Sequence, residues 1–163
     1  MRIKIYQLID PEKANNGIFT PVAEKGIDSS LYKQVYFGDV VGKELDDLCF
    51  VLNKDLPLTH QGSRLSSSDV IEVCNEENNP LVQNGFYYYD SCKFNRVPFD
   101  SSKCADMEGM RVVYVTPNHT PIEIHINGSL EGMQNAVDGL IEPVYNRDGT
   151  IVVCNEEGSA KCS

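Results

Sequence analysis

The sequence has no tryptophan, only three histidines and no long uninterrupted apolar segment. No stretch reaches the roughly 20 apolar residues that a membrane helix needs, so we expect no membrane association. The apolar run at the amino terminus is interrupted by Lys4 and Gln7 and ends at Asp10, which is too short and too polar for a signal peptide. We therefore expect a cytoplasmic protein.

Six cysteines are present, but no Cys-x-x-Cys pair and no histidine at zinc-finger spacing accompany them. This pattern argues against a structural metal site, and a cytoplasmic location argues for reduced thiols. We expect Cys49 on a helix face and Cys74 and Cys154 at strand ends, each as a small buried hydrophobe. We expect neither a metal nor a cofactor.

Basic residues are few, since 14 Lys and Arg stand against 24 Asp and Glu, for a formal net charge of −10. Binding to nucleic-acid phosphates depends on clustered positive charge, so direct nucleic-acid binding is not expected. The acidic excess is spread, because residues 1–108 hold 17 acidic and 11 basic residues and residues 109–163 hold 7 and 3. A DNA mimic needs a denser acidic surface, so mimicry is not favoured.

With 163 residues, of which 41% are apolar, the chain can form one ordinary domain or two small ones. The first hundred residues predict a mostly antiparallel sheet with one helix. The helix is indicated by Leu45, Leu48, Cys49 and Leu52, which share one helical face between residues 42 and 53. Alternating apolar and polar residues predict extended segments at 2–9, 32–38, 70–73, 85–91 and 93–99.

Residues 101–110 lack periodicity and carry small polar side chains, which predicts a linker. Behind it, the pattern predicts strands at 111–115, 122–126 and 150–154. A helix is expected from Leu130 to Ile141, with Ser129 as its N-cap and Glu131 in its first turn. The fold class is therefore α+β in two small units: residues 1–100, and a strand-strand-helix-strand unit at 111–163.

No catalytic motif is recognisable. Candidate bases are His60, His119 and His125, and paired carboxylates would come from Glu142, Glu156 and Glu157, but none has the spacing that catalysis requires. The Ser66–Ser68 run lacks the GxSxG pattern, and neither phosphate-binding glycine motif is present. We expect no enzyme and no catalytic residues.

Two candidate binding surfaces remain. The first consists of Tyr87, Tyr88 and Tyr89 beside Asp90, with acidic support from Glu76 and Glu77. The alternative is that alternate tyrosines fill the core of the sheet and only one or two face water.

The second candidate surface combines Glu142 with Asn155, Glu156 and Glu157, which the order of elements can bring to the same edge of the second unit. Such a surface suits a basic partner or a cation. The alternative is that Asn155 and Glu156 cap and solvate a turn.

Two resemblances rest on particular segments. Residues 1–99 resemble a YodL-like domain through IKIYQLI, GIDSSLYKQVYFG, GSRLSSSDVIEV and YYYDSCKF. Residues 111–158 resemble a short domain of unknown function that recurs in conjugative elements and phages of Firmicutes, through EGMQNAVDGLIEPVY and VCNEEG. That family commonly has Gly-Gly where this chain has Asp138-Gly139. The resemblance implies a bacterial mobile-element setting and brings no catalytic residues.

This setting and the acidic charge favour a binding protein, most specifically an anti-defence inhibitor such as an anti-CRISPR that binds a nucleic-acid-handling protein. The alternative is a small-molecule or nucleotide-binding module that uses a crevice between the two units. An anionic nucleotide would need basic residues there, and the available arginines are Arg64, Arg96, Arg111 and Arg147.

Overall fold

The computed structural model describes residues 1–14, 26–54, 56–77, 79–91 and 93–158. The chain divides into two compact units, Met1–Met107 and Glu108–Ser163. Both contain strands and helix, so the predicted α+β class is confirmed. Two of the six cysteines, Cys92 and Cys162, lie outside the described residues.

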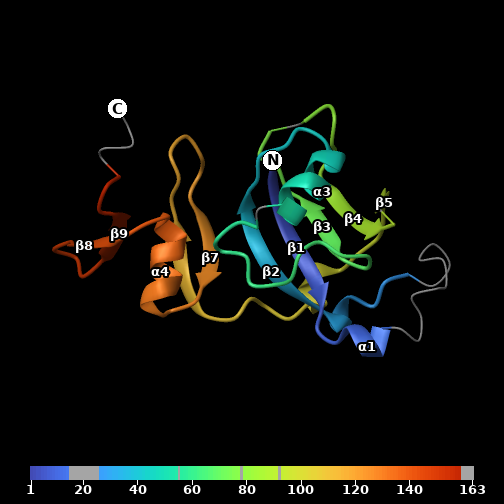
Figure 1. The fold of residues 1–163 in the computed structure, drawn as a ribbon, viewed down its shortest axis with the longest axis horizontal. Helices are drawn as coiled ribbons and strands as arrows, with labels where there is room; N and C mark the ends of the chain where they lie inside the picture. The colour runs from blue at the N-terminus through green and yellow to red at the C-terminus, as the bar shows by residue number, and fades with distance from the viewer. Residues whose placement is uncertain (15–25, 55, 78, 92, 159–163) are drawn as a thin grey trace. The chain divides into compact units, whose positions relative to one another are not determined.

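The first unit contains a five-stranded antiparallel sheet in the order β2-β1-β3-β4-β5 (Figure 1). The predicted mostly antiparallel sheet is thus confirmed. Short helical turns lie at α1 (Pro11–Ala14), Ser29–Leu31 and Ser101–Lys103. The strands are β1 (Arg2–Leu8), β2 (Tyr32–Asp39), β3 (Val70–Val73), β4 (Gly85–Asp90) and β5 (Lys93–Arg96).

One face of this sheet packs against α3 (Leu45–Lys54), which confirms the predicted helix. Leu48 and Leu52 are fully buried, and Leu45 and Cys49 pack partly buried against the same cluster. This is the face expected from the spacing of the apolar residues, because positions three and four apart meet on one side of a helix.

The other face of the sheet carries an aromatic cluster. Phe99 lies with its ring centroid 5.3 Å from that of Tyr6 and 5.4 Å from that of Tyr32. The segment expected to be a linker reaches back to the sheet here, since Ala105 N donates to Tyr32 O at 2.9 Å. Met107 is also buried, so both faces of the sheet are covered.

The second unit consists of two hairpins with a helix between them in the chain. β6 (Met110–Tyr114) pairs with β7 (Ile122–Ile126), and β8 (Ile141–Tyr145) pairs with β9 (Ile151–Asn155). Helix α4 (Leu130–Val137) contacts β7, β8 and β9. Its N-cap is Ser129, as predicted, with the hydroxyl accepting from Gly132 N at 3.1 Å.

The predicted helix end at Ile141 is wrong by four residues. The helix stops at Val137 because Asp138 adopts the left-handed conformation (φ 55°, ψ 51°) and Gly139 follows with φ 157°. Ile141 instead starts β8, a strand that the helical spacing had concealed. Pairing with β9 decides the conformation here, as isoleucine, valine and tyrosine favour strands.

In the part of the chain that the structure describes, no helix combines the length and apolar character needed to cross a membrane.

Candidate functional site

The hairpin of β8 and β9 carries the second candidate surface. Its register pairs Glu142 with Cys154 and Val144 with Val152, so these four side chains share one face. Glu156 N donates to Leu140 O at 2.9 Å, which extends the pairing and places Glu156 on that same face. The structure therefore brings Glu142 and Glu156 to neighbouring positions, as the sequence had suggested.

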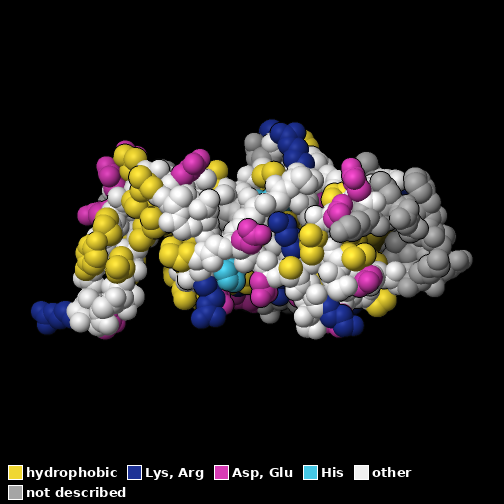
Figure 2. Space-filling view, turned by 90° about the horizontal axis from the view of Figure 1, so that it is seen from below, with side chains coloured by type: hydrophobic (Ala, Val, Ile, Leu, Met, Phe, Trp, Pro, Cys, Tyr) yellow, Lys and Arg dark blue, Asp and Glu magenta, His cyan; other side chains and the backbone are white. Residues whose placement is uncertain are grey.

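Apolar side chains on this hairpin are unusually exposed. Val144 is 45% exposed and Val152 43% on the face of Glu142, while Tyr145 and Ile151 are 73% and 56% exposed on the other. A hairpin with two exposed apolar faces is marginal as an isolated element and is typical of a binding surface. Figure 2 shows hydrophobic side chains gathered where Figure 1 places β8 and β9, on the left of both views.

These four exposed apolar residues were not among the predicted site residues, because the helical spacing through Ile141 concealed β8 and the candidate surface was defined by its charged residues. The sequence does contain a hairpin pattern, because two apolar segments rich in strand-forming residues flank the turn Asn146–Gly149. We call the exposed side chains Val144 and Val152 together with Glu142, Cys154 and Glu156 the hairpin face.

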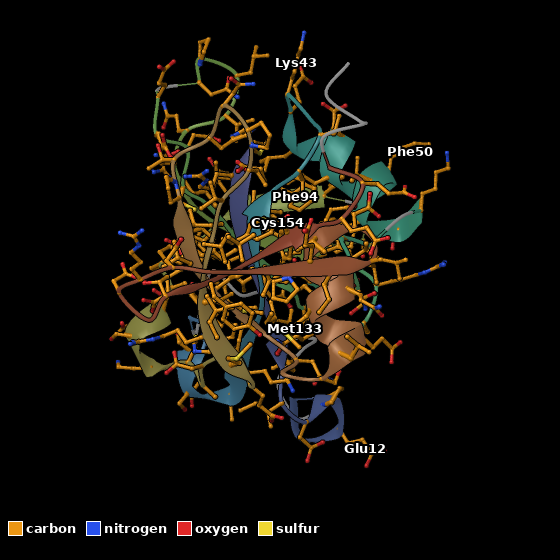
Figure 3. All side chains as sticks on the ribbon, turned by 90° about the vertical axis from the view of Figure 1, so that its left-hand side faces the viewer. Glu12, Lys43, Phe50, Phe94, Met133 and Cys154 are labelled. Carbon is orange, nitrogen blue, oxygen red and sulfur yellow. The ribbon has the colours of Figure 1, made fainter. Side chains whose placement is uncertain are left out.

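Asn155 joins the hairpin to the end of the helix. Its Nδ2 donates to Val137 O at 3.1 Å and to Asp138 O at 2.7 Å, at the end of α4. Its Oδ1 accepts from Glu157 N at 2.8 Å, which is the turn-capping contact of the alternative interpretation. Figure 3 labels Cys154 on β9 and Met133 on α4. Glu157 itself is exposed.

The tyrosines of the first candidate surface lie in the interior of the first unit. Tyr87, Tyr88 and Tyr89 are 8%, 6% and 6% exposed. Tyr87 and Tyr89 belong to the cluster under α3, and Tyr88 to the aromatic cluster on the opposite face. Alternation along β4 had suggested that one or two would face water. All three are buried because both faces of the sheet are covered.

The acidic residues near this strand differ in their surroundings. Glu76 forms an ion pair with the buried guanidinium of Arg2, which also binds Asp39 Oδ2 at 2.9 Å. Glu77 and Asp90 are exposed. Because the three tyrosines are buried, they do not serve as surface anchors beside these acids. The binding role predicted for this group stays a prediction.

The histidines do not form a recognisable catalytic arrangement among the described residues. His60 stacks on Tyr36 with centroids 5.9 Å apart, and its Nδ1 accepts from Gly62 N at 3.0 Å. Burial lowers the pKa of His60, which favours its neutral form. His125 lies on β7 and His119 in the preceding loop. Within the described ranges, no cluster of three or more His, Cys, Asp or Glu could hold a metal ion.

Of the cysteines, Cys49 and Cys74 are partly buried, in line with the sequence analysis. Burial raises the pKa of the Cys74 thiol to about 11. Cys154 was expected to be buried, and this is wrong, because its side chain projects from the exposed hairpin face.

Two of the four arginines that could bind a nucleotide, Arg96 and Arg111, have partners within their own units. Arg96 donates to Gln83 Oε1 at 2.9 Å and to Asn84 O at 3.1 Å. Arg111 Nη1 lies 3.6 Å from Glu123 Oε1 across the first hairpin of the second unit. Arg64 and Arg147 are exposed. The nucleotide-binding alternative stays a prediction.

Comparison with known proteins gives two family matches. Residues 2–99 match the YodL-like domain, and residues 110–162 match a domain of unknown function (DUF3846). No curated protein and no solved structure matches the chain. The first match spans the whole five-stranded sheet and the second spans both hairpins and the helix between them. The chain therefore belongs to the YodL-like domain family and carries a DUF3846 domain after it.

Proposed function

We propose that this protein is a non-enzymatic binding protein that contacts another protein through the hairpin face. The observation that carries this proposal is the exposure of Val144 and Val152 beside the carboxylates of Glu142 and Glu156. Exposed apolar groups with a polar rim are typical of protein interfaces, because their burial releases water while the rim selects the partner.

The charge of the surface determines the kind of partner. An acidic rim on a chain of net charge −10 attracts a basic protein surface and repels the phosphates of free nucleic acid. Basic surfaces of this kind occur in proteins that handle nucleic acids. Together with the mobile-element setting that the family resemblance implies, this supports an anti-defence inhibitor, for example an anti-CRISPR, acting in the cytoplasm.

The test is capture of partners from a bacterial host lysate on the tagged chain, with and without nuclease, followed by reconstitution of the complex from purified components. We expect a nucleic-acid-handling protein that binds at a fixed stoichiometry and survives nuclease. Glu142→Lys and Val144→Ser should each weaken the reconstituted complex by at least about tenfold, because one reverses the rim charge and the other removes apolar contact.

Matched controls are available on exposed sites elsewhere. Glu44→Lys changes the net charge as Glu142→Lys does, and Val113→Ser removes an exposed valine from β6. Neither should alter binding. Equal losses in the controls and the test variants would contradict the hairpin face as the binding site, and a complex that depends on nucleic acid would contradict protein–protein inhibition.

A further inference from the structure

The two outer edges of the second hairpin are defined by its hydrogen bonds. Asn146 N donates to Thr150 O at 2.9 Å at one end, and Glu156 N donates to Leu140 O at the other. In an antiparallel pair, bonded and non-bonded residue pairs alternate. The pair Pro143 and Val153 is therefore non-bonded, and the backbone polar groups of both residues point away from the hairpin.

These two edges differ in their capacity to accept another strand. On β8 the outward positions are Ile141, Pro143 and Tyr145, and the central one, Pro143, has no N–H and interrupts pairing along this edge. On β9 the outward positions include Ile151 and Val153, which keep their N–H groups. No backbone hydrogen bond from another described segment reaches either residue. The hairpin thus has one closed edge and one open edge.

The strand at the open edge also has no charged side chain, since β9 reads Ile-Val-Val-Cys-Asn. Ile151 is 56% exposed and Val152 is 43% exposed, on opposite faces of the strand. Edge strands in folded proteins are usually protected by charges, prolines or a covering element. An uncharged, apolar strand with an open edge therefore indicates a strand-pairing surface.

We propose that β9 pairs antiparallel with β9 of a second copy of the chain, around a two-fold axis at Val153. The result is a four-stranded sheet in which Val153 faces its own copy and Val152 faces Cys154 of the second copy. A strand without charges suits such pairing, because no like charges meet along it. This inference goes beyond the proposed function and does not depend on it.

Charge complementarity at the ends of the interface favours a second copy as the occupant. In this register the turn that holds Arg147 lies beside the turn that holds Glu156 and Glu157 of the other copy, once on each side. The other charge of the first turn is Asp148, and its Oδ1 accepts from Thr150 N within the turn at 2.9 Å. Each end of the paired strands thus brings a guanidinium toward two carboxylates.

The dimer would also join two hairpin faces into one. Side chains of Glu142, Val144, Val152 and Cys154 from each copy would continue across the two-fold axis on the same side of the sheet. The acidic residue Glu142 would lie near each outer rim, with apolar side chains between. A partner with two-fold symmetry, or a long basic groove, would match this doubled surface.

Disulfide trapping tests the register directly. The two Val153 residues would form a hydrogen-bonded pair, whose Cα atoms lie about 5.5 Å apart, within reach of a disulfide. Val153→Cys, in a chain with Cys92, Cys154 and Cys162 changed to serine, should give a covalent dimer under mild oxidation. Val113→Cys in the same chain is the matched control on the other hairpin and should remain monomeric.

Sedimentation equilibrium tests the reversible dimer. Arg147→Glu should raise the dissociation constant of the dimer about tenfold, through loss of two surface ion pairs and added repulsion. Combining it with Glu156→Arg and Glu157→Arg should restore dimerisation. Val153→Pro should abolish the dimer and leave the hairpin intact, because it removes an outward N–H just as Pro143 does on β8.

Two outcomes would overturn the proposal. One is a wild-type chain that sediments as a monomer at all concentrations, with no more trapping at Val153→Cys than at Val113→Cys. The other is a dimer that persists in Val153→Pro, since that association would use a different surface. Circular dichroism of each variant separates loss of the dimer from loss of the fold.

Discussion

Gln7 and Asp69 meet in the interior of the first unit, where Gln7 Nε2 donates to Asp69 Oδ2 at 2.9 Å across 62 positions of the chain. Ser66 N donates to the same carboxylate at 2.8 Å, so Asp69 joins β1 to the turn before β3. Burial outweighs these hydrogen bonds and raises the pKa of Asp69 from 3.8 to about 6.

A raised carboxyl pKa predicts a specific dependence of stability on pH. The folded state holds the Asp69 proton more tightly than the unfolded chain. The resulting contribution of Asp69 to the free energy of unfolding is therefore fully present below pH 3.8. It is lost as the pH rises through about 6. As the pH rises from 4 to 7, we expect the free energy of unfolding of Asp69→Asn to increase relative to that of the wild type, by on the order of 3 kcal/mol.

Urea denaturation of both chains at several pH values measures this difference. The other titrating groups contribute equally to the free energy of unfolding of both chains, so their contributions cancel in the difference. A difference in unfolding free energy that stays constant from pH 4 to pH 7 would contradict the raised pKa.

The core under α3 predicts a strong contrast between neighbouring helix positions. Leu52 is fully buried, and Leu52→Ala should lower the free energy of unfolding by about 2–5 kcal/mol through lost burial and a cavity. Phe50 is 67% exposed, with Lys54 Nζ 5.4 Å from its ring centroid. Phe50→Ala should cost less than about 1 kcal/mol. Equal losses in urea denaturation would show that the helix does not pack as described.

Asn155 predicts how the second hairpin is held. Asn155→Ala removes the two hydrogen bonds to the end of α4 and should destabilise the hairpin by about 1–3 kcal/mol. Amide exchange in β8 and β9 should accelerate, whereas β1 and β3 should not change. Asn95→Ala, on an exposed position of β5, is the control. Unchanged exchange in β8 and β9 would show that Asn155 does not anchor them.

Cysteine reactivity should follow exposure. Cys154 is exposed, whereas burial raises the pKa of Cys74 and of Cys104 to about 11. At pH 7.5 a maleimide should modify Cys154 well before the other two, because the thiolate is the reactive species and burial restricts access. Peptide mapping by mass spectrometry at short times measures the order. Equally rapid modification of Cys74 would contradict its burial.

The spacing of apolar residues predicted a helix or strand correctly where one face of that element packs against a single core. The spacing of Leu45, Leu48, Cys49 and Leu52 predicted α3, and the confirmed N-cap at Ser129 came from side-chain chemistry alone. The predicted end of the second helix was wrong, since the spacing of Leu140 and Ile141 also fits a helical face. A left-handed residue at Asp138 and pairing with β9 overrode that spacing.

The sequence alone determined the α+β class, the antiparallel sheet with its helix, and the excess of negative charge, because each depends on composition or on near neighbours in the chain. Only the tertiary structure decided which side chains face water. Tyr88 is buried because Phe99 and the segment up to Met107 cover the second face of the sheet. Val144 and Val152 are exposed because no described segment covers that face of the hairpin. Burial depends on contacts between distant parts of the chain, which periodicity does not encode.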